Sequence, residues 1–264
     1  MSEKWKTPPV FYALAQVQFN AIAEHKFADD IQDAFRQAGF PDAVLEQQVQ
    51  LSIEGEAGAA TPPRFTQQLS MRRSFMDAQK GEGFVWLPNA LTYHTTRYQN
   101  FEHFQAQFKK GLEVMAQVTR PDYVERVGSR YLDLVVPTAP HALSRYLVPQ
   151  VLGLSESNHG EGHSMCETVS RKDTTTLISR VFIANGEGQA APLPAEMGLL
   201  HLQMADRFQV VTGAFAVLDT DCYELLPREA FDPVRIVASL ARVKTRISNT
   251  FSGILTDEAK KEWQ

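Results

Sequence analysis

The sequence predicts an α+β fold, a curved antiparallel sheet with long helices packed on one of its faces. Several stretches alternate apolar and polar residues and are joined in pairs by short turns, which is typical of hairpins. Two long amphipathic stretches follow these strands, one in each half of the chain. Strands do not alternate with helices, which argues against a doubly wound parallel sheet. Two similar α+β halves, residues 1–137 and 138–264, would fit this order as parts of one compact unit.

The first half contains strands, one short helix and a hairpin. Alternation after Pro8-Pro9 predicts the first strand, and the apolar stripe that ends at Gly39 predicts the helix. Turn residues around Gly81 join the last two strands as a hairpin. The expected elements are a strand at Val10–Phe19, a helix at Phe27–Phe40, strands at Gln47–Glu54, Arg64–Asp77 and Gly83–Thr96, and a loop at 54–63.

The region from Tyr98 to Pro137 reads as a helix, a break and a strand. Its apolar residues recur at three- and four-residue steps, Asn100 can cap the helix, and Pro121 ends it because proline has no N–H group. The following residues, Val124–Val136, predict a strand of period two. The apolar helix positions are Phe101, Phe104, Phe108, Leu112 and Met115.

The second half repeats the scheme of hairpins followed by a long helix. Asp232 as N-cap and Pro233 at the first helical position predict the start of the last helix. Its buried stripe is expected to include Val234, Val237, Leu240, Ala241, Lys244, Ile247 and Phe251. The other expected elements are a short helix or turn at His141–Leu154, a hairpin of Gly162–Lys172 and Thr174–Asn185, a loop at Gly186–Gly198, and a third strand pair of Leu199–Ala205 and Gln209–Asp221.

Composition limits the class of protein. The 264 residues are 44% hydrophobic, which supports a proper core, and two cysteines without a motif favour a reducing compartment. The net charge of −5 counts against generic nucleic-acid binding, although Arg235, Arg242, Lys244 and Arg246 leave a basic patch on the last helix open. Apolar runs fall short of the ~18 residues of a membrane span, and the N-terminus lacks a signal-peptide core. We expect a cytoplasmic protein without membrane contact.

Two arginines share one face of the predicted strand Val124–Val136. Arg126 and Arg130 would stand roughly 13 Å apart, with Gly128 between them, at ~3.3 Å per residue. They could pair with carboxylates on neighbouring strands, or they could recognise a phosphate or carboxylate ligand. Tyr131, the neighbour of Arg130, is a third candidate for ligand binding.

Asp219 and Asp221 end an apolar stretch and fall on one face of a strand, because residues two apart point the same way. Such a pair could hold Mg²⁺ for phosphoryl or nucleotidyl transfer and would then be catalytic. The alternative is an ion-pair network with strand arginines such as Arg126, Arg130 or Arg180. A third carboxylate, a catalytic lysine or a Gly-Ser pair to complete a nucleotidyltransferase pattern is absent nearby.

A cluster of metal-ligand types lies in a glycine-rich segment. His159, Glu161, His163 and Cys166 could bind zinc, but their spacing fits no standard zinc motif. An exposed loop, with Cys166 as a packed thiol, is the preferred interpretation. Nucleotide-binding and hydrolase motifs are also absent, so we expect no cofactor.

Several short motifs resemble those of one family. Tyr98-x-Asn-Phe-x-x-Phe104 followed by Arg126-Val-Gly-x-Arg130-Tyr131 resembles the signature of a sporadically distributed prokaryotic family that is known by a catalogue number and has no assigned function. Pro8-Pro9-Val10 and Val217-Leu-Asp-Thr-Asp221, with the closing helix, fit the same resemblance. It implies one family unit over nearly the whole chain and transfers no catalytic residues.

These observations favour a non-enzymatic interaction protein, acting as a homodimer or as a subunit of a larger assembly. The sporadic distribution implied by the resemblance would suit an accessory or defence locus. One alternative is a small-ligand or metal-dependent enzyme that uses Asp219, Asp221 and the arginine face. A second alternative is a nucleic-acid-binding module.

Overall fold

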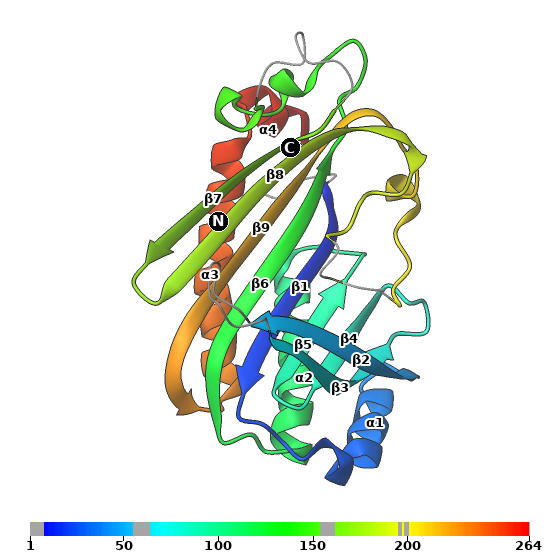
Figure 1. Ribbon diagram of the computed structural model, residues 1–264, viewed down its shortest axis with the longest axis vertical. Helices are drawn as coiled ribbons and strands as arrows, with labels where there is room; N and C mark the ends of the chain where they lie inside the picture. Colours follow the sequence, from blue (N-terminus) through cyan, green and yellow to red (C-terminus); the bar gives the residue numbers. More distant parts are fainter. Residues whose placement is uncertain (1–7, 55–63, 154–161, 195–196, 198–200, 264) are drawn as a thin grey trace.

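In the described residues, nine antiparallel strands form one continuous sheet in the order β2-β3-β4-β5-β1-β6-β9-β8-β7 (Figure 1). The computed structural model describes residues 8–54, 64–153, 162–194, 197 and 201–263, with the backbone alone for 47–70. The strands are β1 Val10–Phe19, β2 Asp42–Glu54, β3 Arg64–Met76, β4 Glu82–Leu87, β5 Ala90–Thr95, β6 Tyr123–Val135, β7 Ser164–Lys172, β8 Thr175–Gln189 and β9 Val211–Ala230. The α+β class and the antiparallel sheet are therefore confirmed.

The chain follows a similar path twice. A first strand, β1, is followed by short helices and by an antiparallel meander that returns to pair with β1 through β5, and then by α2, Phe101–Val118. The second pass starts at β6, returns to pair with β6 through β9, and ends in α3, Pro233–Ile254. The two first strands, β1 and β6, pair with each other at the centre of the sheet.

The long helices cover one face of the sheet, which we call the helix face. Helices α1 (Ala28–Gln37), α2 and α3 lie on this side, behind the strands in Figure 1. The main core fills the space between them, with Phe35, Phe84, Phe104 and Phe108 fully or almost fully buried. Burying aromatic side chains of this size is the dominant favourable contribution to such a core.

The expected helix caps are present. Asn100 accepts a hydrogen bond from the backbone N–H of His103 at 2.8 Å, and Asp232 accepts one from Val234 at 2.8 Å. Gly39 adopts a positive φ of 100° two residues after the end of α1, as the sequence predicts for a helix stop. Helix α2 ends before Pro121, as expected.

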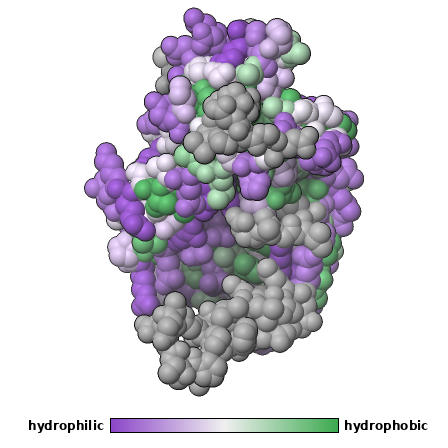
Figure 2. Space-filling model, turned by 45° about the horizontal axis from the view of Figure 1, so that its top comes forward, coloured by the Kyte–Doolittle hydropathy of each residue, from purple (hydrophilic) through white to green (hydrophobic). Residues whose placement is uncertain are grey.

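On the opposite side of the sheet, which we call the open face, the part of the chain that the structure describes forms a covering layer at one end. The segment before β9 packs Phe208 against Phe11, with ring centroids 5.8 Å apart, and joins a second apolar cluster there. Figure 2 shows a hollow on the molecule where hydrophilic and apolar residues both line the surface. Polar side chains can therefore lie in the middle of this face.

Two strand predictions were wrong. Gly83–Thr96 is not one strand but the hairpin of β4 and β5, because Pro88 and Asn89 form a turn between them. Leu199–Ala205 is not a strand in its described part; the chain forms a 3₁₀ turn at Asp206–Phe208 instead. Strand β9 therefore does not pair with Leu199–Ala205, as predicted, but with β6 and β8. It runs nine residues beyond Asp221, to Ala230.

Smaller differences concern element ends. Strand β2 starts at Asp42, earlier than expected, and β8 continues to Gln189 into the predicted loop. Val234 is exposed, so it does not belong to the buried stripe of α3, while Ile236 and Val243 do. A short final helix, α4 (Asp257–Trp263), was not predicted. The predicted loop at 54–63 falls, after residue 54, outside the described residues.

Candidate functional site

Four of the predicted site residues, Arg126, Arg130, Asp219 and Asp221, lie together on the open face. On β6 and β9, Arg130 stands opposite Asp221 in the register, and Leu132 stands opposite Asp219. Arg130 makes a bidentate ion pair with Asp219: Nε donates to Oδ1 at 2.7 Å and Nη2 donates to Oδ2 at 2.6 Å. Both residues are buried, at 9% and 5% exposure. This geometry is the strongest form of an arginine–carboxylate interaction.

The ion pair continues across two more strands. Arg180 of β8 places Nη1 at 3.4 Å from Asp219 Oδ2 and donates from Nε to Glu167 of β7 at 2.6 Å. A row of alternating charges therefore links β6, β9, β8 and β7. The interpretation of Asp219 as a partner of strand arginines is confirmed. A metal ion would have to displace these guanidinium groups to reach its oxygens.

Asp221 and Arg126 complete the group. Burial raises the pKa of Asp221, and the positive charges of Arg126 and Arg130 oppose that shift. The Arg126 guanidinium lies 4.0 Å from the centre of the Tyr223 ring, a cation–π contact. Gly128 leaves room for this stack, since a Cβ there would lie 3.2 Å from the Cβ of Tyr223.

The charges of this group balance. Arg126, Arg130 and Arg180 face the three carboxylates Asp219, Asp221 and Glu167. An incoming anion would therefore meet as much negative as positive charge. Arg130 and Arg180 are paired within this group, whereas the buried Nε of Arg126 has no hydrogen-bond partner among the described residues. Anion recognition by the arginine face therefore stays a prediction.

Tyr131 is not part of this group, because it lies on the helix face. It is buried under α3, with the Lys244 ammonium 4.1 Å from its ring centre. Burial lowers the pKa of Lys244 and raises that of Asp133, and the attraction between the two groups opposes both shifts. Lys244 thus belongs to the interior, as its place in the predicted stripe implies.

The predicted metal ligands are only partly described. His159 and Glu161 lie outside the described residues. His163 packs its ring on Phe182 at 5.7 Å between centroids, whereas the Cys166 thiol lies 4.0 Å from the carbonyl oxygen of Gln150. Within the described part of the chain, groups of three or more His, Cys, Asp or Glu side chains that could hold a metal are not found.

The basic residues of α3 are mostly engaged by the protein itself. Arg242 donates to the buried carboxylate of Glu224 at 2.9 Å, and Arg246 donates to the Thr175 carbonyl and to the Ser170 hydroxyl, each at 3.2 Å. The side chains of Arg235 and Arg242 are 71% and 57% exposed, whereas Lys244 is turned inward, so the four cations do not all face solvent.

Strand β7 lies at one edge of the sheet. This edge was not predicted from the sequence. The outer edge of β7 has no partner strand among the described residues. Met165 and Val169 on this strand are 67% and 47% exposed. Figure 1 shows the β7–β8 hairpin projecting beyond the helices. The sequence gives little indication that β7 is an edge strand, because the order of strands in a sheet cannot be read from hydrophobic periodicity.

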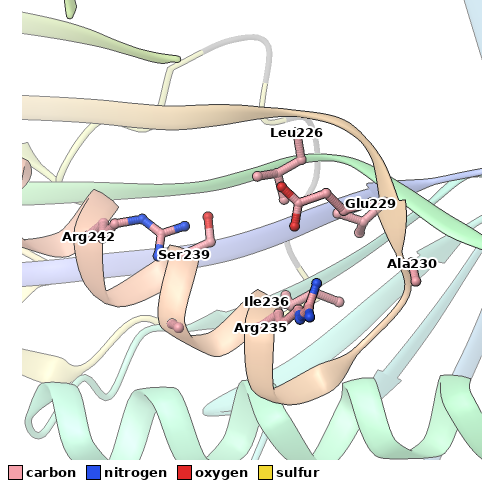
Figure 3. A pocket seen from close by; sticks show the side chains of 9 residues that line it. Leu226, Glu229, Ala230, Arg235, Ile236, Ser239 and Arg242 are labelled. Atoms are coloured by element: carbon pink, nitrogen blue, oxygen red, sulfur yellow. The ribbon is translucent and has the colours of Figure 1, made fainter. Parts of the chain in front are cut away.

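A cavity of about 260 Å³ lies between the end of β9 and the first turns of α3 (Figure 3). Val124, Leu226 and Ile236 form apolar walls, and Glu229, Arg235 and Arg242 supply charge. Sequence reasoning missed it, because its walls come from β6, β9 and α3, which are brought together only by the fold.

Comparison of the chain with protein-family models gives no match, and neither does comparison with curated proteins. In the described residues, none of the helices has both the length and the apolar character needed to cross a lipid bilayer.

Proposed function

We propose that the protein acts by association in the cytoplasm, without enzymatic activity, as a homodimer in which two copies pair their β7 edges. The observation that supports this proposal is the β7 edge, which has no partner strand among the described residues and carries exposed apolar side chains. The resemblance to a sporadically distributed family is compatible with it but assigns no residue a role.

An open strand edge is a ready template for another strand. The backbone N–H and C=O groups on the outer side of β7 lack a strand partner among the described residues. Proteins often protect such an edge with charged side chains, proline or a bulge; β7 carries Glu167, Arg171 and Lys172 but contains no proline and pairs with β8 in unbroken register. Pairing would also cover part of Met165 and Val169.

The sequence of β7 is complementary to itself in one antiparallel register. When Val169 faces Val169 of a second copy, Glu167 stands opposite Arg171 and Thr168 stands opposite Ser170. Opposite charges and β-branched pairs across strands each contribute about 0.2–1 kcal/mol. The two-fold axis of this dimer passes between the two Val169 residues, so each of the other contacts occurs twice, as a closed dimer requires.

Helix α3 holds the β7–β8 hairpin in place from behind. Arg246 bonds both strands of the hairpin, through Ser170 of β7 and Thr175 of β8. Arg242 adds a second link through Glu224, which also accepts a hydrogen bond from Thr174 at 3.4 Å. An edge that is already ordered loses less conformational entropy when it binds.

Native mass spectrometry and a cysteine crosslink test this dimer. We expect a dimer for the wild type and a monomer for Val169→Lys, because the register places the two new lysines opposite each other. The control is Val210→Lys, which changes a valine of 67% exposure outside β7.

Val169→Cys, in a Cys166→Ser background, should form a disulfide-linked dimer on mild oxidation. Directly opposed residues on antiparallel strands have Cα atoms about 4.5–5.5 Å apart, within the range of a disulfide. Val210→Cys in the same background should not crosslink. A monomeric wild type, or equal crosslinking at both positions, would refute the proposed interface.

A further inference from the structure

The cavity between β9 and α3 presents opposite charges on facing walls. Figure 3 shows Glu229 reaching from β9 and Arg235 reaching from α3 toward the same space. Among the described residues these two side chains form no ion pair with each other; Arg235 lies 3.8 Å from Asp232 instead and is 71% exposed. Both groups are therefore accessible to a small molecule.

The third charged side chain that lines the cavity, Arg242, already has a partner within the protein. Arg242 donates from Nη2 to the Glu224 carboxylate at 2.9 Å and from Nε at 3.3 Å. Ser239, at the back of the cavity, also donates to Glu224. The groups that remain for a ligand are one carboxylate, Glu229, and one guanidinium, Arg235, whose ion pair with Asp232 is long, at 3.8 Å, and exposed to solvent.

The shape limits the size of the ligand. About 260 Å³ is less than the roughly 300–1,000 Å³ of pockets for drug-sized molecules. The apolar walls of Val124, Leu226 and Ile236 can bury a short hydrocarbon side chain. A small molecule with an apolar part and a polar end fits these walls.

The charges select among small ligands. A simple anion would be repelled by the Glu229 carboxylate, and a simple cation would be repelled by the Arg235 guanidinium. A zwitterion can place its carboxylate on Arg235, whose fork geometry suits a carboxylate, and its ammonium on Glu229. We propose that this cavity binds a free α-amino acid with an apolar side chain. This site is separate from the β7 edge and does not depend on dimer formation.

Isothermal titration of the full chain with L-leucine tests the proposal. We expect saturable binding at one site per chain, and little binding of 4-methylpentanoate or 3-methylbutylamine, which lack the ammonium and the carboxylate of leucine, respectively. Arg235→Gln and Glu229→Gln should each weaken leucine binding about tenfold or more, since each removes a charge-assisted hydrogen bond.

Arg228→Gln is the matched control, because Arg228 is an exposed neighbour that pairs with Glu125 at 3.7 Å and does not line the cavity. It should bind leucine like the wild type. No heat with leucine at about 10 mM would overturn the proposal, and so would equal binding of 4-methylpentanoate or equal losses in all three variants. Melting curves of the variants establish that each is folded.

Discussion

Replacing Asp219 by asparagine should destabilise the protein strongly, because it removes the carboxylate charge that forms the bidentate ion pair with the buried Arg130 guanidinium. The two oxygens of Asp219 accept from Arg130 at 2.7 and 2.6 Å, and the Arg130 side chain is only 11% exposed. Breaking a buried pair on one side costs about 3–5 kcal/mol. For a chain of this size, about 2–4 °C of melting temperature corresponds to each kcal/mol, so a fall of about 6–20 °C is expected.

The assay is urea unfolding of Asp219→Asn beside Asp221→Asn. Asp221 is partly exposed and its pKa is raised by burial, so a neutral amide there should cost under about 1 kcal/mol. The double variant Arg130→Met, Asp219→Leu replaces the pair by apolar groups and should recover most of the loss. The reasoning is refuted if the two asparagine variants agree within about 0.5 kcal/mol, or if the double variant is as unstable as Asp219→Asn.

Two further predictions concern other parts of the sheet and its helices. Gly111→Ala should destabilise by about 1 kcal/mol or more in urea, because the new methyl group would lie 2.8 Å from Cδ1 of the packed Phe84 ring and the cost of overpacking exceeds the gain in helix propensity. Gly253→Ala, also in a helix but with no atom within 4 Å of the new Cβ, should be neutral or stabilising by up to about 1 kcal/mol; equal effects would contradict this comparison. Burial, aided by the charge of Arg72, lowers the pKa of His94 to about 3. Between about pH 3 and 6.5 the unfolded chain therefore binds more protons at this residue, and stability falls as the pH falls through that window, by up to about 1.4 kcal/mol per pH unit. His94→Gln should flatten this part of the pH dependence of unfolding, and an unchanged slope would show that His94 does not contribute.

Local sequence signals were sufficient for helices α1, α2 and the start of α3, and for the faces of β6, but not for the short helix α4. Asn100 and Asp232 cap their helices as predicted, because a cap depends on residues within one turn. The alternation of β6 correctly separated Arg130 from Tyr131, because a strand places successive side chains on opposite faces.

Features that depend on distant partners were harder to predict. The carboxylates of Asp219 and Asp221 suggested the end of a strand, yet β9 continues because Arg130 and Arg180 neutralise Asp219 from both neighbouring strands. The arginines that do so are 89 and 39 residues away in the sequence. The cavity beside α3 and the position of β7 at the edge of the described sheet likewise follow from strand order, which no local pattern encodes.

The pairing of β1 with β6 has a consequence for how the chain folds during synthesis. Strand β1 finds its first partner in β5, with Leu14 opposite His94, so the first pass of the fold can form its hydrogen bonds and receive α2 before β6 is made. When β6 emerges from the ribosome, it pairs with the other edge of β1, with Arg130 opposite Leu14. Strands β9, β8 and β7 then extend the sheet beyond β6. Domains tend to fold from the N-terminus as they are synthesised. We therefore expect residues 1–120, expressed alone, to retain β-structure but to aggregate through the uncovered β1 edge, and to be rescued when the remaining segment is supplied as a separate chain.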